Sequence, residues 1–289
     1  MIVKPISWAE AIAAAEHELL HSASKDARLN AELLAAHVLG VWSRSEVREQ
    51  ANRHLSQQDL DFYRSLIRRR MQHEPLQYIT GETEFFGLRL YCSPVALIPR
   101  PDTEILVEEA LKVAAERSGD VRILDIGTGS GCIALAIASK LPNATVIGID
   151  VSADALTLAE KNRKRCSLEH VEFIEADIHD QAQVEALGRF DIIVSNPPYV
   201  PLSEYQMLEQ EVRDFEPRNA LTDEGNGLSF YEEIVRVTPM LLRHEGRLLV
   251  EIGYGALEAI TGLDSDLSII SVSKDLSDID RVIVFAMKQ

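Results

Sequence analysis

Two periodicities divide the chain into an amino-terminal helical part and a longer part in which strands and helices alternate. Between residues 1 and about 75, apolar residues recur at helical spacing, as in Ile12, Ala15 and Leu19, so each helix can bury one face. From about residue 103, short apolar runs alternate with amphipathic stretches. This alternation predicts an α/β domain with a mainly parallel sheet covered by helices on both faces.

Local signals place the individual elements. Ser7 followed by Glu10 predicts a capping box at the start of the first helix, and Gly40 is suited to end the second. The apolar runs predict strands at Arg122–Ile126, Thr145–Asp150, Val171–Ala176, Asp191–Ser195, Arg247–Glu251, Leu267–Val272 and Arg281–Ala286. Amphipathic helices are expected among them, for example at Ser130–Lys140 and Ala153–Arg165.

A short segment separates the two parts. Pro75 ends the helical region, and Glu84–Tyr91 reads as two short strands around Gly87, which predicts a β-hairpin. We therefore expect a small helical domain at 1–75, a hairpin linker at 76–100 and the α/β domain at 101–289.

The charge limits the possible partners. The 289 residues carry a net charge of −17, which repels a nucleic-acid backbone over the general surface. The basic run formed by Arg64, Arg68, Arg69 and Arg70 is interpreted as a solvated face near a helix end, where cations oppose the helix dipole. Nucleic acid is therefore not an expected partner.

Cysteine usage and hydropathy favour a cytoplasmic protein. Cys92, Cys132 and Cys166 are far apart, with no CxxC pair, which suits a reducing compartment and argues against a zinc site. The amino terminus lacks an apolar core followed by a cleavage site, and no apolar run is long enough to span a membrane. We expect no metal and no membrane partner.

The first chemical motif follows the strand at Asp191–Ser195, where the chain reads Asn196-Pro197-Pro198-Tyr199. The prolines stiffen the backbone and leave carbonyl oxygens free to accept hydrogen bonds. Asn196 adds an amide oxygen, and Tyr199 adds an aromatic face. The motif suits a planar NH2 group, although an ordinary strand-ending turn has the same composition.

The second motif is the glycine-rich turn after the strand at Arg122–Ile126. It consists of Gly127, Thr128, Gly129, Ser130 and Gly131. Glycines in such a turn allow close backbone approach to a ligand, although a purely structural turn is also compatible with them. The next strand ends in Asp150, which can accept from ribose hydroxyls or cap the following helix. Asp177, with Ile178 beside it, can accept from an adenine amino group or act as a turn residue.

These signals gain weight from their shared position. Gly127, Asp150, Asp177 and Asn196 follow four consecutive predicted strands, and ligands of open α/β sheets bind outside the carboxyl ends of the strands. The combination predicts an adenosine-containing ligand with a group that reacts beside Asn196.

With these motifs the chain resembles the HemK/PrmC family of class I, Rossmann-like methyltransferases. The similar segments are Pro75–Gly81, Glu84-Phe85, Leu97–Glu104 (LIPRPDTE), Glu216-Pro217, Ala220-Leu221 and Glu251–Gly253. The resemblance extends over essentially the whole chain. It implies a mainly parallel seven-stranded sheet with an all-helical amino-terminal domain joined by a β-hairpin. Ile178 stands where the family often has an aromatic residue.

The family transfers a methyl group from S-adenosylmethionine to the N5 amide nitrogen of a glutamine in peptide chain release factors, leaving S-adenosylhomocysteine. The resemblance implies catalytic roles for Asn196, Pro197, Pro198 and Tyr199, and a supporting role for Arg100. It implies cofactor contacts from Gly127, Thr128, Gly129, Ser130, Gly131, Asp150, Asp177, Ile178 and Asn196. The helical domain is expected to dock the protein substrate, and the protein is expected to be a monomer.

Three other functions share some of these features. A DNA adenine-N6 methyltransferase holds the same kind of NH2 group but needs base flipping and a basic surface. A glutamine methyltransferase of a ribosomal protein shares the chemistry, and the IPRPDTE segment favours release factors over it. A non-catalytic adenosine-binding module has no need of the Asn196–Tyr199 motif.

Overall fold

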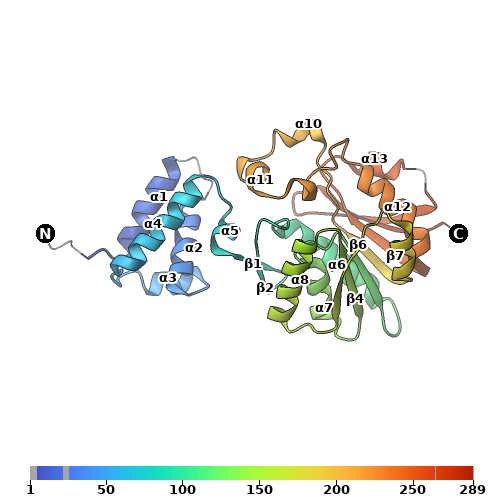
Figure 1. The fold of residues 1–289 in the computed structure, drawn as a ribbon, viewed down its shortest axis with the longest axis horizontal. Helices are drawn as coiled ribbons and strands as arrows, with labels where there is room; N and C mark the ends of the chain where they lie inside the picture. The colour runs from blue at the N-terminus through green and yellow to red at the C-terminus, as the bar shows by residue number, and fades with distance from the viewer. Residues whose placement is uncertain (1–4, 22–25, 264, 289) are drawn as a thin grey trace. The chain divides into compact units, whose positions relative to one another are not determined.

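A seven-stranded sheet forms the centre of the larger of two structural units in the computed structural model, which describes residues 5–21, 26–263 and 265–288. One unit comprises Met1–Gly81 with Glu209–Phe215, and the other comprises Glu82–Leu208 with Glu216–Gln289. Among the described residues, no helix has both the length and the apolar character needed to cross a membrane. Figure 1 shows the elements of both units along the chain.

The first unit is helical, as the periodicity predicts. Its helices are α1 (Trp8–His21), α2 (Ala27–Leu39), α3 (Arg44–Glu49), α4 (Gln57–Met71), α5 (Leu76–Thr80) and α11 (Gln210–Phe215). The predicted caps are present: the Glu10 N–H donates to Ser7 Oγ over 3.3 Å, and Gly40 adopts a left-handed conformation after α2. Trp8, Leu19 and Leu34 belong to its buried core.

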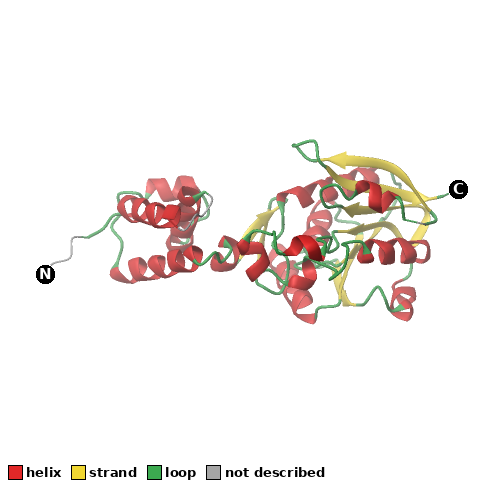
Figure 2. Cartoon of the chain, turned by 90° about the horizontal axis from the view of Figure 1, so that it is seen from above, coloured by secondary structure: helices red, strands yellow, loops and turns green. Residues whose placement is uncertain are grey.

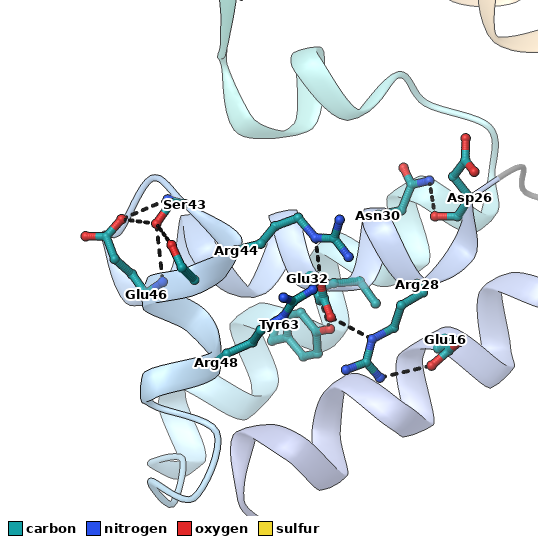
Figure 3. Close-up of polar contacts among 12 residues, drawn as sticks. Glu16, Asp26, Arg28, Asn30, Glu32, Ser43, Arg44, Glu46, Arg48 and Tyr63 are labelled. Atoms are coloured by element: carbon teal, nitrogen blue, oxygen red, sulfur yellow. Dashed lines mark hydrogen bonds and ion pairs between the residues drawn. The ribbon is translucent and has the colours of Figure 1, made fainter.

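A buried carboxylate joins three helices of this unit. Figure 3 shows Glu32 of α2 accepting from Arg28 Nε over 2.7 Å and from Arg44 Nε over 2.5 Å. Arg28 also donates to Glu16 of α1 over 3.0 Å. Burial raises the pKa of Glu32, but the hydrogen bonds from the two arginines outweigh it and hold the pKa below its usual value. A buried charge requires such pairing, so the cluster fixes how these helices pack.

The interpretation of the basic run as a solvated face is wrong for Arg70. Arg64 and Arg68 are exposed, but Arg70 is buried. Its guanidinium donates to Asn30 Oδ1 over 3.0 Å and to the Glu74 carbonyl over 2.9 Å, and it pairs with Glu211 over 2.6 Å. The sequence shows which residues of α4 are cationic. It does not show which polar groups from distant segments contact Arg70.

The second unit carries the sheet, in the order β5-β4-β3-β6-β7-β9-β8. Its strands are β3 (Arg122–Ile126), β4 (Thr145–Asp150), β5 (Val171–Glu175), β6 (Phe190–Ser195), β7 (Leu242–Glu251), β8 (Leu267–Lys274) and β9 (Asp280–Met287). The first five are parallel to one another, whereas β9 is antiparallel to both β7 and β8. A hairpin of β1 (Glu82–Phe85) and β2 (Leu88–Tyr91) turns at Gly87.

Helices cover both faces of the sheet, as Figure 2 shows. Neighbouring residues of one strand, such as Ile123 and Leu124, face two separate buried clusters because side chains alternate along a strand. One cluster includes α6 (Glu104–Ala115) and α7 (Cys132–Lys140), with α8 (Ala153–Cys166) packed beside them, and the other includes α9 (Gln181–Leu187), α12 (Ser229–Leu241) and α13 (Leu257–Thr261). The shorter helical elements are η1 (Pro101–Thr103), α10 (Leu202–Tyr205) and η2 (Arg218–Ala220). The predicted α/β class and sheet are confirmed.

Candidate active site

A pocket of about 310 Å³ lies at the carboxyl ends of the parallel strands in the second unit. Segments after β3, β4, β5 and β6 line it, together with residues before α6 and in α12. The expected site residues that line it are Arg100, Gly127, Thr128, Gly129, Ser130, Asp150, Asp177, Ile178, Asn196, Pro197 and Pro198. Gly131 and Tyr199 are not part of this lining.

The glycine-rich turn is held against β4. The N–H groups of Gly127 and Thr128 both donate to the Ile149 carbonyl over 2.9 Å. Gly127 and Gly129 have positive φ values of 71° and 55°, which side-chain-bearing residues rarely adopt. A Cβ on Gly127 would meet no atom within 4 Å. The turn therefore leaves open space beside its backbone for a ligand.

Gly131 has a different task, because it ends the turn and precedes α7. Its φ is 80°, and a Cβ there would lie 2.8 Å from Phe173 Cζ. Glycine is thus required both by the backbone and by the closeness of β5.

We expect Gly131→Ala to destabilise the protein by about 3 kcal/mol, the sum of left-handed strain and overpacking. Gly81→Ala is the matched control, since Gly81 has a φ of 76° and no neighbour within 4 Å of its Cβ position. That variant should lose only about 1 kcal/mol. Urea unfolding followed by circular dichroism measures both changes, and equal losses would contradict the packing argument.

Beneath the turn, Asp125 is completely buried. Its Oδ2 accepts from Thr128 Oγ1 over 2.6 Å and from the Ala134 N–H over 3.2 Å, while its Oδ1 has no hydrogen-bond partner among the residues that the structure describes. Burial raises the pKa of Asp125 to about 7. The carboxyl group supports the turn, but its burial makes ionisation energetically unfavourable.

This burial predicts a pH-dependent stability. An acid whose pKa is raised on folding contributes stability below its unfolded pKa and loses it as the pH rises through the folded pKa. The free energy of unfolding of Asp125→Asn, relative to that of the parent, should therefore increase by up to about 4 kcal/mol as the pH rises from 4 to 8. Urea unfolding at pH 5 and pH 8 measures the difference; a difference independent of pH would rule out the titration of Asp125.

Asp150 faces the pocket from the end of β4. Its Oδ2 accepts from the Gly129 N–H and its Oδ1 from the Ser152 N–H, both over 2.9 Å. Ser152, not Asp150, caps α8, because its hydroxyl accepts from the Ala155 N–H over 3.2 Å. Each carboxylate oxygen retains a further lone pair, so Asp150 can accept two hydroxyl groups.

Asp177 and Ile178 follow β5. Asp177 Oδ1 accepts from the His179 N–H over 2.9 Å, which lowers the pKa of Asp177. This bond closes a turn after β5, so Asp177 does act as a turn residue, while Asp180 caps α9. Ile178 is buried and lines the pocket, and Phe230 of α12 lines it as well. Phe230 supplies an aromatic surface that the sequence after β5 lacks.

Asn196, Pro197 and Pro198 enter the pocket where β6 ends. Ser195 Oγ donates to the Ile126 carbonyl over 2.9 Å, which joins the ends of β6 and β3. Asn196 Nδ2 donates to Thr103 Oγ1 over 3.2 Å. The amide of Asn196 is therefore held by a side chain from the start of α6.

Tyr199 lies behind the pocket instead of in its wall. A Cβ on Gly253 would lie 2.9 Å from Tyr199 Cδ2, so glycine allows this ring to approach the segment after β7 closely. Burial raises the pKa of Tyr199 to about 12. Gly227 similarly approaches the Tyr199 carbonyl oxygen, which would be 2.5 Å from a Cβ at that position. Two glycines thus fix the backbone that follows the prolines.

Arg100 lines the pocket and forms an ion pair with Glu216, whose side chain is 1% exposed. Glu216 Oε2 also accepts from the Ile98 N–H over 3.1 Å. Arg100 and Glu216 both lie in the second unit. Their ion pair fixes the segment before α6 against the pocket.

Sequence reasoning missed Thr103, Phe230 and Glu251. Thr103 and Phe230 line the pocket, and Glu251 is a buried carboxylate whose pKa is affected by Thr103 and Asn196. Thr103 and Glu251 belong to segments already singled out by similarity, but no local signal distinguished Phe230.

Comparisons with known proteins identify the family of the chain. Residues 117–264 match the family model of a methyltransferase domain, and residues 10–81 match that of the PrmC N-terminal domain. The release factor glutamine methyltransferase of Geobacter sulfurreducens is 41% identical over 90% of this chain and 89% of its own length. That of Chlorobaculum tepidum is 41% identical over 88% of each chain.

Among solved structures, the hMettl16 catalytic domain in complex with the MAT2A 3'UTR hairpin 6 superposes with a TM-score of 0.53. It is 17% identical and covers 71% of this chain and 77% of that chain, which supports the fold alone. The whole-length sequence similarity confirms the family expected from the motifs. The chain therefore belongs to the release factor glutamine methyltransferase family.

Proposed function

We propose that this protein transfers the methyl group of S-adenosylmethionine to the side-chain amide nitrogen, N5, of a glutamine in peptide chain release factors. The observation that carries the proposal is the shared pocket: Asn196 and Pro197 line the same cavity as the glycine-rich turn and Asp150. Acceptors for a planar NH2 group thus lie beside a site suited to an adenosine.

The residues present fit this cofactor. Asp150 offers acceptors for the two ribose hydroxyls, and the open turn at Gly127 and Gly129 allows close backbone approach. Ile178 and Phe230 provide apolar surfaces for the adenine ring, with Asp177 as an acceptor for its amino group. When bound, the cofactor would supply an electrophilic methyl group on its sulfonium sulfur, with S-adenosylhomocysteine as the neutral leaving group once the sulfur–methyl bond breaks.

The protein's contribution is to orient a poor nucleophile. The lone pair of an amide nitrogen is delocalised into the carbonyl group, so the nitrogen attacks well only when it is held out of that conjugation. We infer that Asn196 Oδ1 and the Pro197 carbonyl accept the two amide hydrogens and direct the lone pair at the methyl carbon. Such positioning can lower the barrier by roughly 7–11 kcal/mol.

The acceptors also stabilise the transition state. As the nitrogen becomes positive, its N–H groups become stronger donors, so these hydrogen bonds tighten during the reaction. Pro198 and Tyr199 keep the acceptors rigid, with Tyr199 acting from behind the pocket against Gly253. The methylated nitrogen loses its extra proton to water after attack, so a strong general base is not required.

For substrate recognition, we propose that the helical unit docks the release factor. The match of residues 10–81 to the PrmC N-terminal domain supports the assignment of substrate docking to the helical unit. In a cytoplasmic setting the protein would act as a monomer on its protein substrate.

The experiment is incubation with methyl-labelled S-adenosylmethionine and either a purified release factor or duplex DNA, followed by mass mapping. We expect one labelled glutamine in the release factor and no label on DNA. Label on DNA alone would overturn the substrate assignment while leaving the methyl-transfer chemistry in place.

A further inference from the structure

A buried carboxylate lies directly behind the site. β6 and β7 are parallel neighbours with Ser195 opposite Val250, so Asn196 and Glu251 follow one another at adjacent strand ends. Glu251 is 2% exposed and, unlike Asn196 and Thr103, does not line the pocket. The Tyr231 hydroxyl donates to the Glu251 main-chain carbonyl over 2.8 Å, which anchors this end of β7.

The side chain of Asn196 has one orientation that serves catalysis. Its Nδ2 donates to Thr103 Oγ1 over 3.2 Å. The nitrogen and oxygen of a planar amide point in different directions, so a partner that holds Nδ2 on the protein side leaves Oδ1 for a ligand. The hydrogen bond to Thr103 does not by itself determine the orientation of the Asn196 amide, because a hydroxyl can donate as well as accept.

Glu251 lies beside this amide, because Asn196 and Glu251 follow the paired residues Ser195 and Val250 on neighbouring parallel strands. In the described part of the chain, Glu251 Oε2 is buried and has no hydrogen-bond partner. A carboxylate oxygen only accepts hydrogen bonds, so Oε2 is available to the second amide hydrogen of Asn196 and to the Thr103 hydroxyl. Burial raises the pKa of Glu251 to about 7, while the Thr103 hydroxyl, Arg281 and the Asn196 amide oppose that rise.

We propose that Glu251 is a positioning residue for methyl transfer, whose carboxylate, together with the Thr103 hydroxyl, holds the N–H side of Asn196 and so presents Asn196 Oδ1 to the substrate amide. The inference rests on the proposed role of Asn196. It adds to that role the group that selects the amide orientation.

Other charged and titratable groups surround Glu251. Arg281 of β9 pairs with Asp102 over 2.9 Å and with Asp275 over 2.8 Å, so two carboxylates already share its charge. The phenols of Tyr199 and Tyr231 also face Glu251, and burial raises the pKa of each. Both phenols therefore stay neutral between pH 6 and pH 8, where the charge of Glu251 changes.

A double-mutant cycle tests the coupling. Glu251→Gln should lower kcat about tenfold in the parent but less than about twofold in an Asn196→Ala background, because its effect acts through Asn196. The Kd of S-adenosylhomocysteine should be unchanged. The control is Asp191→Asn, at the opposite end of β6, whose effect should be equal in both backgrounds. An undiminished tenfold loss from Glu251→Gln in both backgrounds would overturn the proposal.

Two Thr103 variants test the bridging hydroxyl. Thr103→Val removes it at nearly constant volume and should lower kcat about tenfold, whereas Thr103→Ser keeps it and should recover most of that loss. Equal kcat values for the valine and serine variants would contradict a role for the hydroxyl.

An NMR measurement tests the contact between Glu251 and Asn196 without requiring methyl transfer. With asparagine-selective ¹⁵N labelling, the Asn196 side-chain amide is identified by its loss in Asn196→Ala. Its signals should move with pH between 6 and 8 in the parent and stay fixed in Glu251→Gln. Signals that do not move in the parent would refute the contact. If they move as expected while no release factor is methylated, the positioning stands and the proposed function fails.

Discussion

Asn196→Ala should lower kcat by roughly 10²–10³, with a much smaller effect on cofactor affinity. The loss is large because Asn196 Oδ1 is proposed to accept a hydrogen bond that strengthens as positive charge develops on the attacking nitrogen. Asn196 lines the pocket, and its side chain is held by Thr103, so the acceptor is in place before the substrate arrives. Single-turnover methylation of a release factor and calorimetric titration with S-adenosylhomocysteine measure the two quantities.

Asn196→Gln is the informative companion variant. It keeps the amide but moves it by one methylene, so it should lose activity nearly as severely if position is what matters. Near-normal turnover by the alanine variant, with cofactor binding intact, would exclude Asn196 from the reaction. A parallel loss of cofactor affinity would instead assign Asn196 to binding.

The strands of the α/β unit could be predicted because their sequence signals are local. The apolar run at Asp191–Ser195 became β6, and Arg122–Ile126 and Thr145–Asp150 became β3 and β4. Both faces of these strands are buried, so the runs are continuous and their ends are marked by glycine or polar residues. Because parallel strands end at one edge, the positions of Asp150 and Asn196 followed from the same pattern.

The remaining features depend on contacts between distant segments. Phe230 reaches the pocket from α12, far along the chain from Ile178, and only the fold brings the two together. Tyr199 is expected beside the substrate amide; it is not part of the pocket lining, and the small size of Gly253 lets its ring pack against the segment after β7. Sequence spacing predicts a surface position for Arg70, but its guanidinium is buried and donates to Asn30 and Glu74. Periodicity identifies buried positions, but it does not identify which polar groups meet.

Asp150→Ala should weaken the binding of S-adenosylhomocysteine by roughly 10²-fold, because charge-assisted hydrogen bonds to the ribose hydroxyls would be lost. Asp150 also accepts from the N–H groups of Gly129 and Ser152, so part of any loss could arise from a displaced turn. The 2′-deoxy analogue of the ligand separates the two causes. It should bind the parent protein more weakly than S-adenosylhomocysteine does, but both ligands should bind Asp150→Ala with similar affinity. Calorimetry of the four combinations of the two proteins with the two ligands completes a thermodynamic cycle. If the substitution weakens both ligands equally, Asp150 shapes the glycine-rich turn and does not contact the ribose.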